Sequence, residues 1–198
     1  MIDIMKKLLA LFLIIVVSLI VRELITQREF IKVAEKQSGL DAIKFYEKVI
    51  LSYVPFSPYN KKAVESIKDI CKTLQKEDEK LYCYETLRTD LIQIKSFYQP
   101  FSDVLYEITP EIAKLRANQM IEWEGSNYSK SDFDRLYKAQ LNLLNYDNSP
   151  SNFWSFITVL SFMMWISSVV LAIYKNVIVG SFGFLIFFTL WILGLFMA

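Results

Sequence analysis

Two cysteines are the residues of this sequence with the most definite covalent chemistry. Cys71 and Cys83 lie at nearly equal distances from a polar turn over residues 75–80. If helices flank this turn, the two thiols face each other across an antiparallel hairpin and can form a disulfide in an oxidising compartment. They are equally ordinary as two reduced residues in an apolar core. The spacing therefore leaves a disulfide and two buried thiols as alternatives.

The other chemistry-bearing residues argue against catalysis and bound cofactors. The sequence contains no histidine, which is the commonest metal ligand and the usual general base near neutral pH. Gly39 and Gly125 are the only glycines in the middle of the chain, too few for a phosphate-binding loop. The run Glu77, Asp78 and Glu79 is expected to be a solvated helix start. We predict no catalytic, cofactor-binding or metal-binding residues, and a protein that is not an enzyme.

Composition and charge divide the chain into three parts. Of all residues, 54% are hydrophobic and 22% are charged, and the charges concentrate in the middle. Residues 22–152 contain 19 basic and 20 acidic side chains, a net charge of −1. This balance does not favour a nucleic-acid partner, because neutralising phosphates needs an excess of basic groups. We predict an N-terminal anchor over 1–26, an extramembrane domain over 27–150 and a C-terminal membrane segment over 151–198.

Three apolar runs predict three transmembrane helices. The C-terminal runs 153–174 and 177–198 have 22 residues each and are separated only by Lys175 and Asn176. At about 1.5 Å per residue each reaches about 33 Å, enough for a hydrocarbon core of about 30 Å, so they predict a transmembrane hairpin. The run 8–21 is shorter, and no small-residue cleavage site follows it. It therefore indicates an uncleaved signal anchor.

The basic residues around the runs favour one orientation. Lys6 and Lys7 precede the first run, and Lys175 lies in the turn between the last two. The positive-inside bias assigns both sites to the cytoplasm, although Arg22 and Arg28 on the other side of the first run weaken it. We expect a multi-pass protein of the inner (cell) membrane, with its middle domain periplasmic or otherwise non-cytosolic.

The spans carry small residues in place of charged ones. No Asp, Glu, Lys or Arg lies inside the three runs, which does not favour a transport or ion site within this chain alone. Small residues at helical spacing let membrane helices approach closely. The candidate packing residues are Thr158, Ser161, Ser168, Ala172, Gly180 and Gly183, with Gly194 further along. They either close the hairpin on itself or dock it onto another membrane subunit.

Between the spans, apolar residues recur at helical spacing with no sustained strand alternation. Ser57 and Thr109 each precede a proline and resemble helix N-caps, and Ser131 with Asp134 resembles a capping box. We therefore predict an all-α domain. The expected helices are 28–38, 41–54, 58–75, 79–98, 102–123 with a break at Pro110, and 131–146.

An internal echo indicates a duplicated helical hairpin. Residues 53–57 (YVPFS) match residues 98–102 (YQPFS), and a Tyr-Glu pair precedes each copy. Chance similarity is the alternative. Aromatic residues at helix junctions belong either to the core or to a partner groove. The candidate groove residues are Tyr53, Phe56, Tyr59, Tyr98 and Phe101.

The helix that carries Ala42, Tyr46 and Val49 and ends near Pro55 resembles the tetratricopeptide-like helical repeats, here in a membrane-anchored bacterial protein. The resemblance covers about residues 28–122, and Pro55 falls one residue later than the family pattern expects. It implies a protein-binding scaffold of stacked helical hairpins.

These features together predict a membrane protein with three transmembrane helices and a helical-hairpin repeat domain. We expect a non-enzymatic accessory or scaffold subunit of a larger membrane complex, whose partners are other membrane protein subunits and the lipid bilayer, with a homo-oligomer also allowed. The alternative is a component of a transport, respiratory or ion-driven machine whose spans border a path formed with other chains. That alternative predicts functional sensitivity at Ser161, Ser168 or Gly183. An enzyme using carboxylates alone would need two inward-facing acids in one pocket, and the sequence identifies no such pair.

Overall fold

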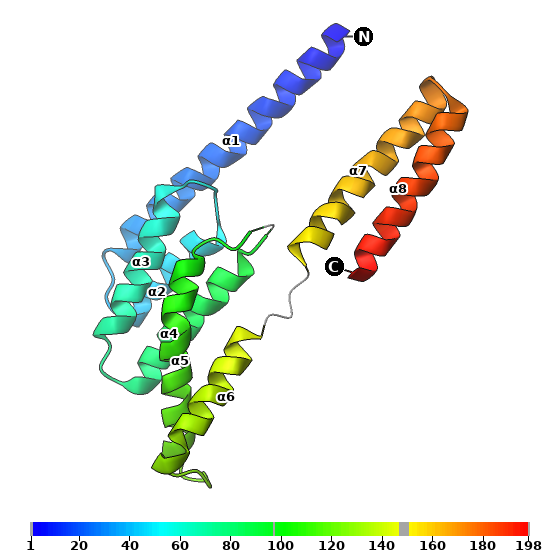
Figure 1. The fold of residues 1–198 in the computed structure, drawn as a ribbon. Helices are drawn as coiled ribbons and strands as arrows, with labels where there is room; N and C mark the ends of the chain where they lie inside the picture. Colours follow the sequence, from blue (N-terminus) through cyan, green and yellow to red (C-terminus); the bar gives the residue numbers. More distant parts are fainter. Residues whose placement is uncertain (1, 97, 147–150, 198) are drawn as a thin grey trace. The chain divides into compact units, whose positions relative to one another are not determined.

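The computed structural model of this chain describes residues 2–96, 98–146 and 151–197, and the side chains from Leu11 onward except those of residues 12, 13 and 152. The described residues form eight α-helices, one short 3-10 helix and no strand, so the all-α prediction is confirmed for them (Figure 1). The chain divides into two compact units. The first, which we call the helical domain, contains α1 to α6, and the second, the C-terminal hairpin, contains α7 and α8. The expected boundary after residue 150 falls on 147–150, outside the described residues.

Helix α1 (Ile2–Ala34) is continuous, so the helix expected over 28–38 is the end of a longer one. Its buried residues Gln27, Ile31 and Ala34 follow each other at steps of four and three and face α2 and α3. Before Gln27, most of the described apolar side chains are exposed. Figure 1 shows this part of α1 extending past the other helices of the domain. Gln27 therefore marks the edge of the domain along α1.

Five further helices complete the domain. Each packs against the next, α1 also packs against α3, and α2 against α4, an arrangement typical of stacked helical hairpins. Cores of this kind are built from one apolar stripe per helix. The helices are α2 (Leu40–Leu51), α3 (Pro58–Thr73), α4 (Glu77–Gln93), α5 (Ser102–Glu122) and α6 (Phe133–Asn145).

A buried polar network fastens α1 to the loop between α2 and α3. The Gln27 side chain is fully buried; its Nε2 donates to the Ser52 carbonyl at 2.6 Å and to Asn60 Oδ1 at 2.8 Å. Its Oε1 accepts from Ser57 Oγ at 2.6 Å. Asn60 Nδ2 in turn donates to the Val54 carbonyl at 2.8 Å. Because these buried groups are satisfied only in this arrangement, the network fixes the loop against α1.

Of the expected helix caps, the one at Ser57 is confirmed and the capping box before α6 lies two residues earlier than expected. Ser57 caps α3, accepting from the backbone N–H of Tyr59 at 3.3 Å. The expected capping box at Ser131 and Asp134 is wrong, because the box forms at Ser129 and Asp132. The sequence from 129 to 134 (SKSDFD) offers the same spacing twice. The structure uses the first, since a 3-10 turn over Lys130–Asp132 precedes α6.

The expected break at Pro110 is also wrong, because α5 runs through it. A proline removes one backbone N–H and clashes with the preceding turn, which usually kinks or ends a helix. Here Ile108 and Ile112, on either side of the proline, are buried and hold α5 against the core. Thr109 does not cap a helix, since its Oγ1 donates to the Leu105 carbonyl at 2.6 Å. Tertiary packing therefore outweighs the local signal.

The C-terminal hairpin consists of α7 (Asn152–Tyr174) and α8 (Val177–Met197). Each contains an apolar stretch, of 22 and 21 residues, with a mean hydropathy of 2.3, and is long and apolar enough to cross a membrane. Most of the side chains on both helices are exposed. The other expected span, over 8–21, falls partly on residues whose side chains lie outside the described ones.

Candidate functional site

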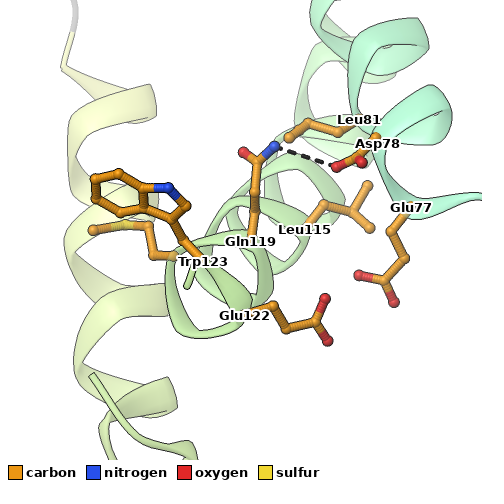
Figure 2. A pocket seen from close by; sticks show the side chains of 8 residues that line it. Glu77, Asp78, Leu81, Leu115, Gln119, Glu122 and Trp123 are labelled. Atoms are coloured by element: carbon orange, nitrogen blue, oxygen red, sulfur yellow. Dashed lines mark hydrogen bonds between the residues drawn. The ribbon is translucent and has the colours of Figure 1, made fainter. Parts of the chain in front are cut away.

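A groove runs along the helical domain between α4, α5 and α6. Its wide part has a volume of about 490 Å³ and is shown in Figure 2. A shallower part of about 360 Å³ shares lining residues with it and continues to Gln140 on α6. The wide part is lined by Glu77, Asp78, Leu81, Leu115, Gln119, Met120, Glu122 and Trp123. The floor is apolar and the rim is acidic.

Carboxylates dominate the charge of this groove. Asp78 accepts a hydrogen bond from Gln119 Nε2 at 3.3 Å (Figure 2). In the shallow part Glu85 is paired with Arg116 at 2.7 Å. Arg116 is the one basic residue among those lining the two parts, so the acidic side chains outnumber it. The field in the groove therefore favours a cation.

The carboxylates of the groove differ in their effect on the stability of the helices that carry them. Glu77 and Asp78 lie in the first turn of α4, where a negative charge complements the helix dipole. Glu122 is the last residue of α5, where the negative end of the dipole disfavours a carboxylate. Figure 2 shows Glu77 and Glu122 directed toward the same opening of the groove. Stabilisation of the helix therefore accounts for an acidic residue at positions 77 and 78, but it does not account for one at position 122.

Trp123 closes one side of the groove and is 72% exposed. Its backbone is fixed, because its N–H donates to the Gln119 carbonyl at 3.1 Å and its carbonyl accepts from the Ser126 N–H at 2.8 Å. An indole face attracts an ammonium or guanidinium group, and the carboxylates of the groove attract the same cation by their charge. The groove can therefore accept a ligand that is cationic at one end and apolar along its stem.

The two cysteines are joined in the structure by a disulfide. Cys71 on α3 and Cys83 on α4 are both fully buried, with an S–S distance of 2.04 Å and a Cα–Cα distance of 5.5 Å. Of the two alternatives that the spacing allowed, the structure contains the bonded one. The bond connects the hairpin α2–α3 to the hairpin α4–α5.

The five candidate aromatic residues do not line the groove between α4, α5 and α6. Phe56 is fully exposed, whereas Tyr59 and Phe101 are partly buried against the core. Tyr53 is also partly buried, and Tyr98 is 49% exposed and belongs to the unit of the C-terminal hairpin. Tyr59 and Phe101 therefore contribute to the core, and the proposed groove of five aromatic residues stays a prediction.

The echo has a structural counterpart in the backbone. Phe56 and Phe101 are the two non-glycine residues with positive φ in the described chain, at 65° and 56°. A left-handed conformation costs a bulky L-residue about 1–2 kcal/mol. Each lies in the last turn before a helix, α3 or α5. The two copies of the sequence motif therefore share a left-handed residue at the same place before a helix.

The small residues of the spans face the inside of the C-terminal hairpin. A Cβ added to Gly180 would overlap the backbone of Ala172, and one added to Gly183 would lie 2.7 Å from Ser168 Oγ. Gly194 is similarly close to Thr158. These glycines let α7 and α8 approach closely, which is the first of the two interpretations that the sequence left open.

Three of the candidate packing residues on α7 have hydroxyl groups that are satisfied within the helix itself. Each donates to the carbonyl four residues earlier, as serine and threonine commonly do in membrane helices. Ser161 and Ser168 are buried in the hairpin. The bonds are Thr158 to Trp154 at 2.8 Å, Ser161 to Ile157 at 2.6 Å and Ser168 to Met164 at 2.8 Å.

An aromatic cluster inside the hairpin was missed by the sequence analysis. Trp165 and Trp191 stack with ring centroids 5.8 Å apart and an interplanar angle of 3°. Phe162, Phe184 and Phe188 surround them. The buried Trp165 N–H has no hydrogen-bond partner among the described residues. The spacing of aromatic residues on both spans carried this signal, but it required the register of α7 against α8.

A buried acid was missed as well. Asp90 of α4 is 2% exposed, and its Oδ2 has no hydrogen-bond partner in the described part of the chain. Burial, together with the charge of Glu47, raises the pKa of Asp90 to about 7. The sequence shows Asp90 between the buried Leu87 and Leu91, and an acid in an apolar stripe is the signal that could have identified it.

The groove is thus the feature of the described residues best suited to hold a ligand. No group of three or more His, Cys, Asp or Glu side chains among the described residues could hold a metal ion. The groove instead offers an aromatic face, an apolar floor and the carboxylates of Glu77, Asp78 and Glu122, of which the first two accept hydrogen bonds from neutral amide groups. This combination suits non-covalent recognition of a basic side chain. Comparisons of the chain with protein-family models, curated proteins and solved structures find no match.

Proposed function

We propose that this protein is a membrane-anchored, non-enzymatic scaffold subunit of a larger membrane complex, and that its helical domain binds a basic segment of a neighbouring subunit. The observation that carries the proposal is the exposed Trp123 in a groove with an excess of carboxylates. A lysine or arginine of the partner would lie over the indole and beside Glu77 or Glu122. The apolar stem of that side chain would cover Leu115.

The proposed anchor consists of three spans. Helices α7 and α8 supply two, and the apolar part of α1 over 8–21 supplies the third. The support for the third is that α1 continues without a break from this run into the domain, with most of its described apolar side chains exposed. We place the helical domain outside the cytosol. The disulfide supports this, because such bonds persist mainly in oxidising compartments.

The domain would act as a scaffold similar to tetratricopeptide-like repeats. Its support is the packing of each helix on the next, of α1 on α3 and of α2 on α4, together with the shared turn at Phe56 and Phe101. In stacked hairpins each unit contacts only its neighbours, which leaves extended surfaces free for partners. The groove between α4, α5 and α6 is one such surface.

The alternative, spans that border a transport or ion path, has less support. It predicts functional sensitivity at Ser161, Ser168 or Gly183. These residues face the inside of the hairpin, and both serine hydroxyls are bonded to their own helix. A path outside the hairpin would have to be bordered by other residues.

The test is purification of the native protein in mild detergent, followed by mass spectrometry of what co-elutes in stoichiometric amounts. We expect defined membrane partners with the wild type and their loss with Trp123→Ala or Glu122→Lys. Tyr106→Ala is the matched control, since Tyr106 is also on α5, is 79% exposed and does not line the groove. A monomer or a homo-oligomer alone would contradict the subunit proposal. Partners retained by both groove variants would contradict only the role of the groove.

A further inference from the structure

We infer that Phe56 is a membrane-interface anchor, which inserts its ring into the polar layer of the bilayer from which α1 emerges. The inference rests on the proposed membrane span of α1 and goes beyond the partner-binding role. It concerns how the helical domain is held against the lipid surface.

The ring of Phe56 is held outside the protein by a fixed loop. Phe56 is fully exposed, whereas its neighbours Val54 and Ser57 are buried. The Ser57 N–H donates to the Val54 carbonyl at 3.1 Å, and Ser57 Oγ donates to Gln27 at 2.6 Å. The backbone on both sides is therefore anchored, so the outward position of the ring belongs to the loop's fixed geometry.

The loop lies at the level of α1 where the membrane surface is expected. Ser57 bonds to Gln27, and Gln27 is six residues beyond Val21, the end of the apolar run. At 1.5 Å per residue this separation is about 9 Å. The polar layer of each leaflet is about 5–8 Å thick, if a hydrocarbon core of about 30 Å lies within a bilayer of about 40–45 Å. The loop therefore lies only about 1–4 Å outside that layer, a gap shorter than a phenylalanine side chain.

The last helix of the domain, α6, ends on the same side of the domain as the loop that carries Phe56. Figure 1 shows the loop between α2 and α3 at the end from which α1 extends. Near the C-terminus of α4, Arg88 donates to the Leu144 carbonyl in the last turn of α6, at 2.7 Å. Helix α6 therefore runs toward the same end.

The second copy of the turn shows that the backbone alone does not expose the ring. Phe101 has nearly the same φ, yet it packs against the core. Leu51, which precedes the loop of Phe56, is exposed too, so the apolar surface at this end is larger than one ring. An apolar ring beside a span is suited to the interface, because burial among lipid removes it from water.

The test uses the full-length chain in phosphatidylcholine vesicles, with an environment-sensitive fluorophore on single introduced cysteines. The native cysteines are bonded to each other and do not label. The positions are Phe56→Cys, Ile14→Cys in the apolar run of α1, and Lys76→Cys as the matched control. Lys76 is an exposed residue beyond the far end of α3, and that helix of 16 residues is about 24 Å long.

Lipids with a nitroxide at the headgroup or high on the acyl chain should quench the label at 56 and shift its emission to the blue, and should leave the label at 76 unchanged. Quenching at 14 but not at 56 would overturn the inference and leave the anchoring by α1 intact. Absence of quenching at both 14 and 56 would overturn the inference together with the span of α1. Quenching at 56 and 76 alike would show non-specific adsorption and would also overturn it.

Discussion

In the first helical hairpin of the domain Phe56 stands free of the protein, whereas in the second Phe101, at nearly the same φ, packs against the core. The polar residues are distributed differently too. Asn60 of α3 is bonded to Gln27, and its counterpart in the second copy is the apolar Leu105. The second copy has its own buried polar group in Asp90. The comparison teaches that the motif determines the turn, and the neighbouring helices determine what its side chains do.

The largest expected effect concerns Asp90, the buried acid of the second copy. The unfolded chain releases the Asp90 proton near pH 4, whereas the folded protein retains it to about pH 7. Between these values the folded state binds more protons, so raising the pH lowers the free energy of unfolding. The loss is roughly 4 kcal/mol, three pKa units at about 1.4 kcal/mol each.

Asp90→Asn should remove this pH dependence. Urea unfolding of the full chain in detergent, followed by circular dichroism at pH 4.5 and pH 7.5, measures it. The variant should be more stable than the wild type at the higher pH, and the difference between the two proteins should shrink at the lower pH. Equal pH slopes for both proteins would mean that Asp90 is ionised in the folded state.

The disulfide between the copies has the next largest expected effect. Replacing Cys71 and Cys83 together by serine should lower the free energy of unfolding by about 3 kcal/mol, because a closed loop of this length restricts the unfolded chain by about that amount. The same unfolding experiment measures it. Reductant should destabilise the wild type similarly and leave the double variant unaffected. A wild type insensitive to reductant under unfolding conditions would show that the thiols are free in solution.

The sequence predicted well what depends on neighbours along the chain. The helical class, the cap at Ser57 and two C-terminal helices long and apolar enough to cross a membrane follow from periodicity and local hydrogen bonds. The pairing of Cys71 with Cys83 was available as one of two alternatives, because the turn between them is short. Pro110 was misjudged, since its local signal is outweighed by the burial of Ile108 and Ile112.

The candidate site was not predicted, because its parts are distant in sequence. Glu77 is next to Glu122 only after α4 and α5 pack together, and the sequence gives no register for that packing. Trp123 by itself reads as one more aromatic residue at a helix end. The small residues of the spans were recognised, but whether Gly180 faces α7 or another subunit depends on the rotation of the two helices.

The polar network of the first copy should have an effect of intermediate size. Asn60→Leu makes the first copy resemble the second, where Leu105 occupies this place, but it removes one hydrogen bond from the buried Gln27 amide and one from the Val54 carbonyl. We expect the free energy of unfolding to fall by about 2 kcal/mol. The double variant Gln27→Leu, Asn60→Leu should recover part of this loss. Additive losses would indicate that the two side chains do not act as one network.

The smallest effects concern the two phenylalanines, and they should differ in sign. Phe56→Gly removes the cost of a positive φ and loses no packing, because the ring touches no other side chain of the core, so stability should rise by about 1 kcal/mol. Phe101→Gly relieves the same strain but removes a ring packed on the core, so the net change should be a loss of about 1 kcal/mol. Detergent-solubilised full-length chains compared by urea unfolding measure both. If the two substitutions change stability equally, the packing of the Phe101 ring on the core contributes nothing measurable. The difference drawn here between the two rings would then be wrong.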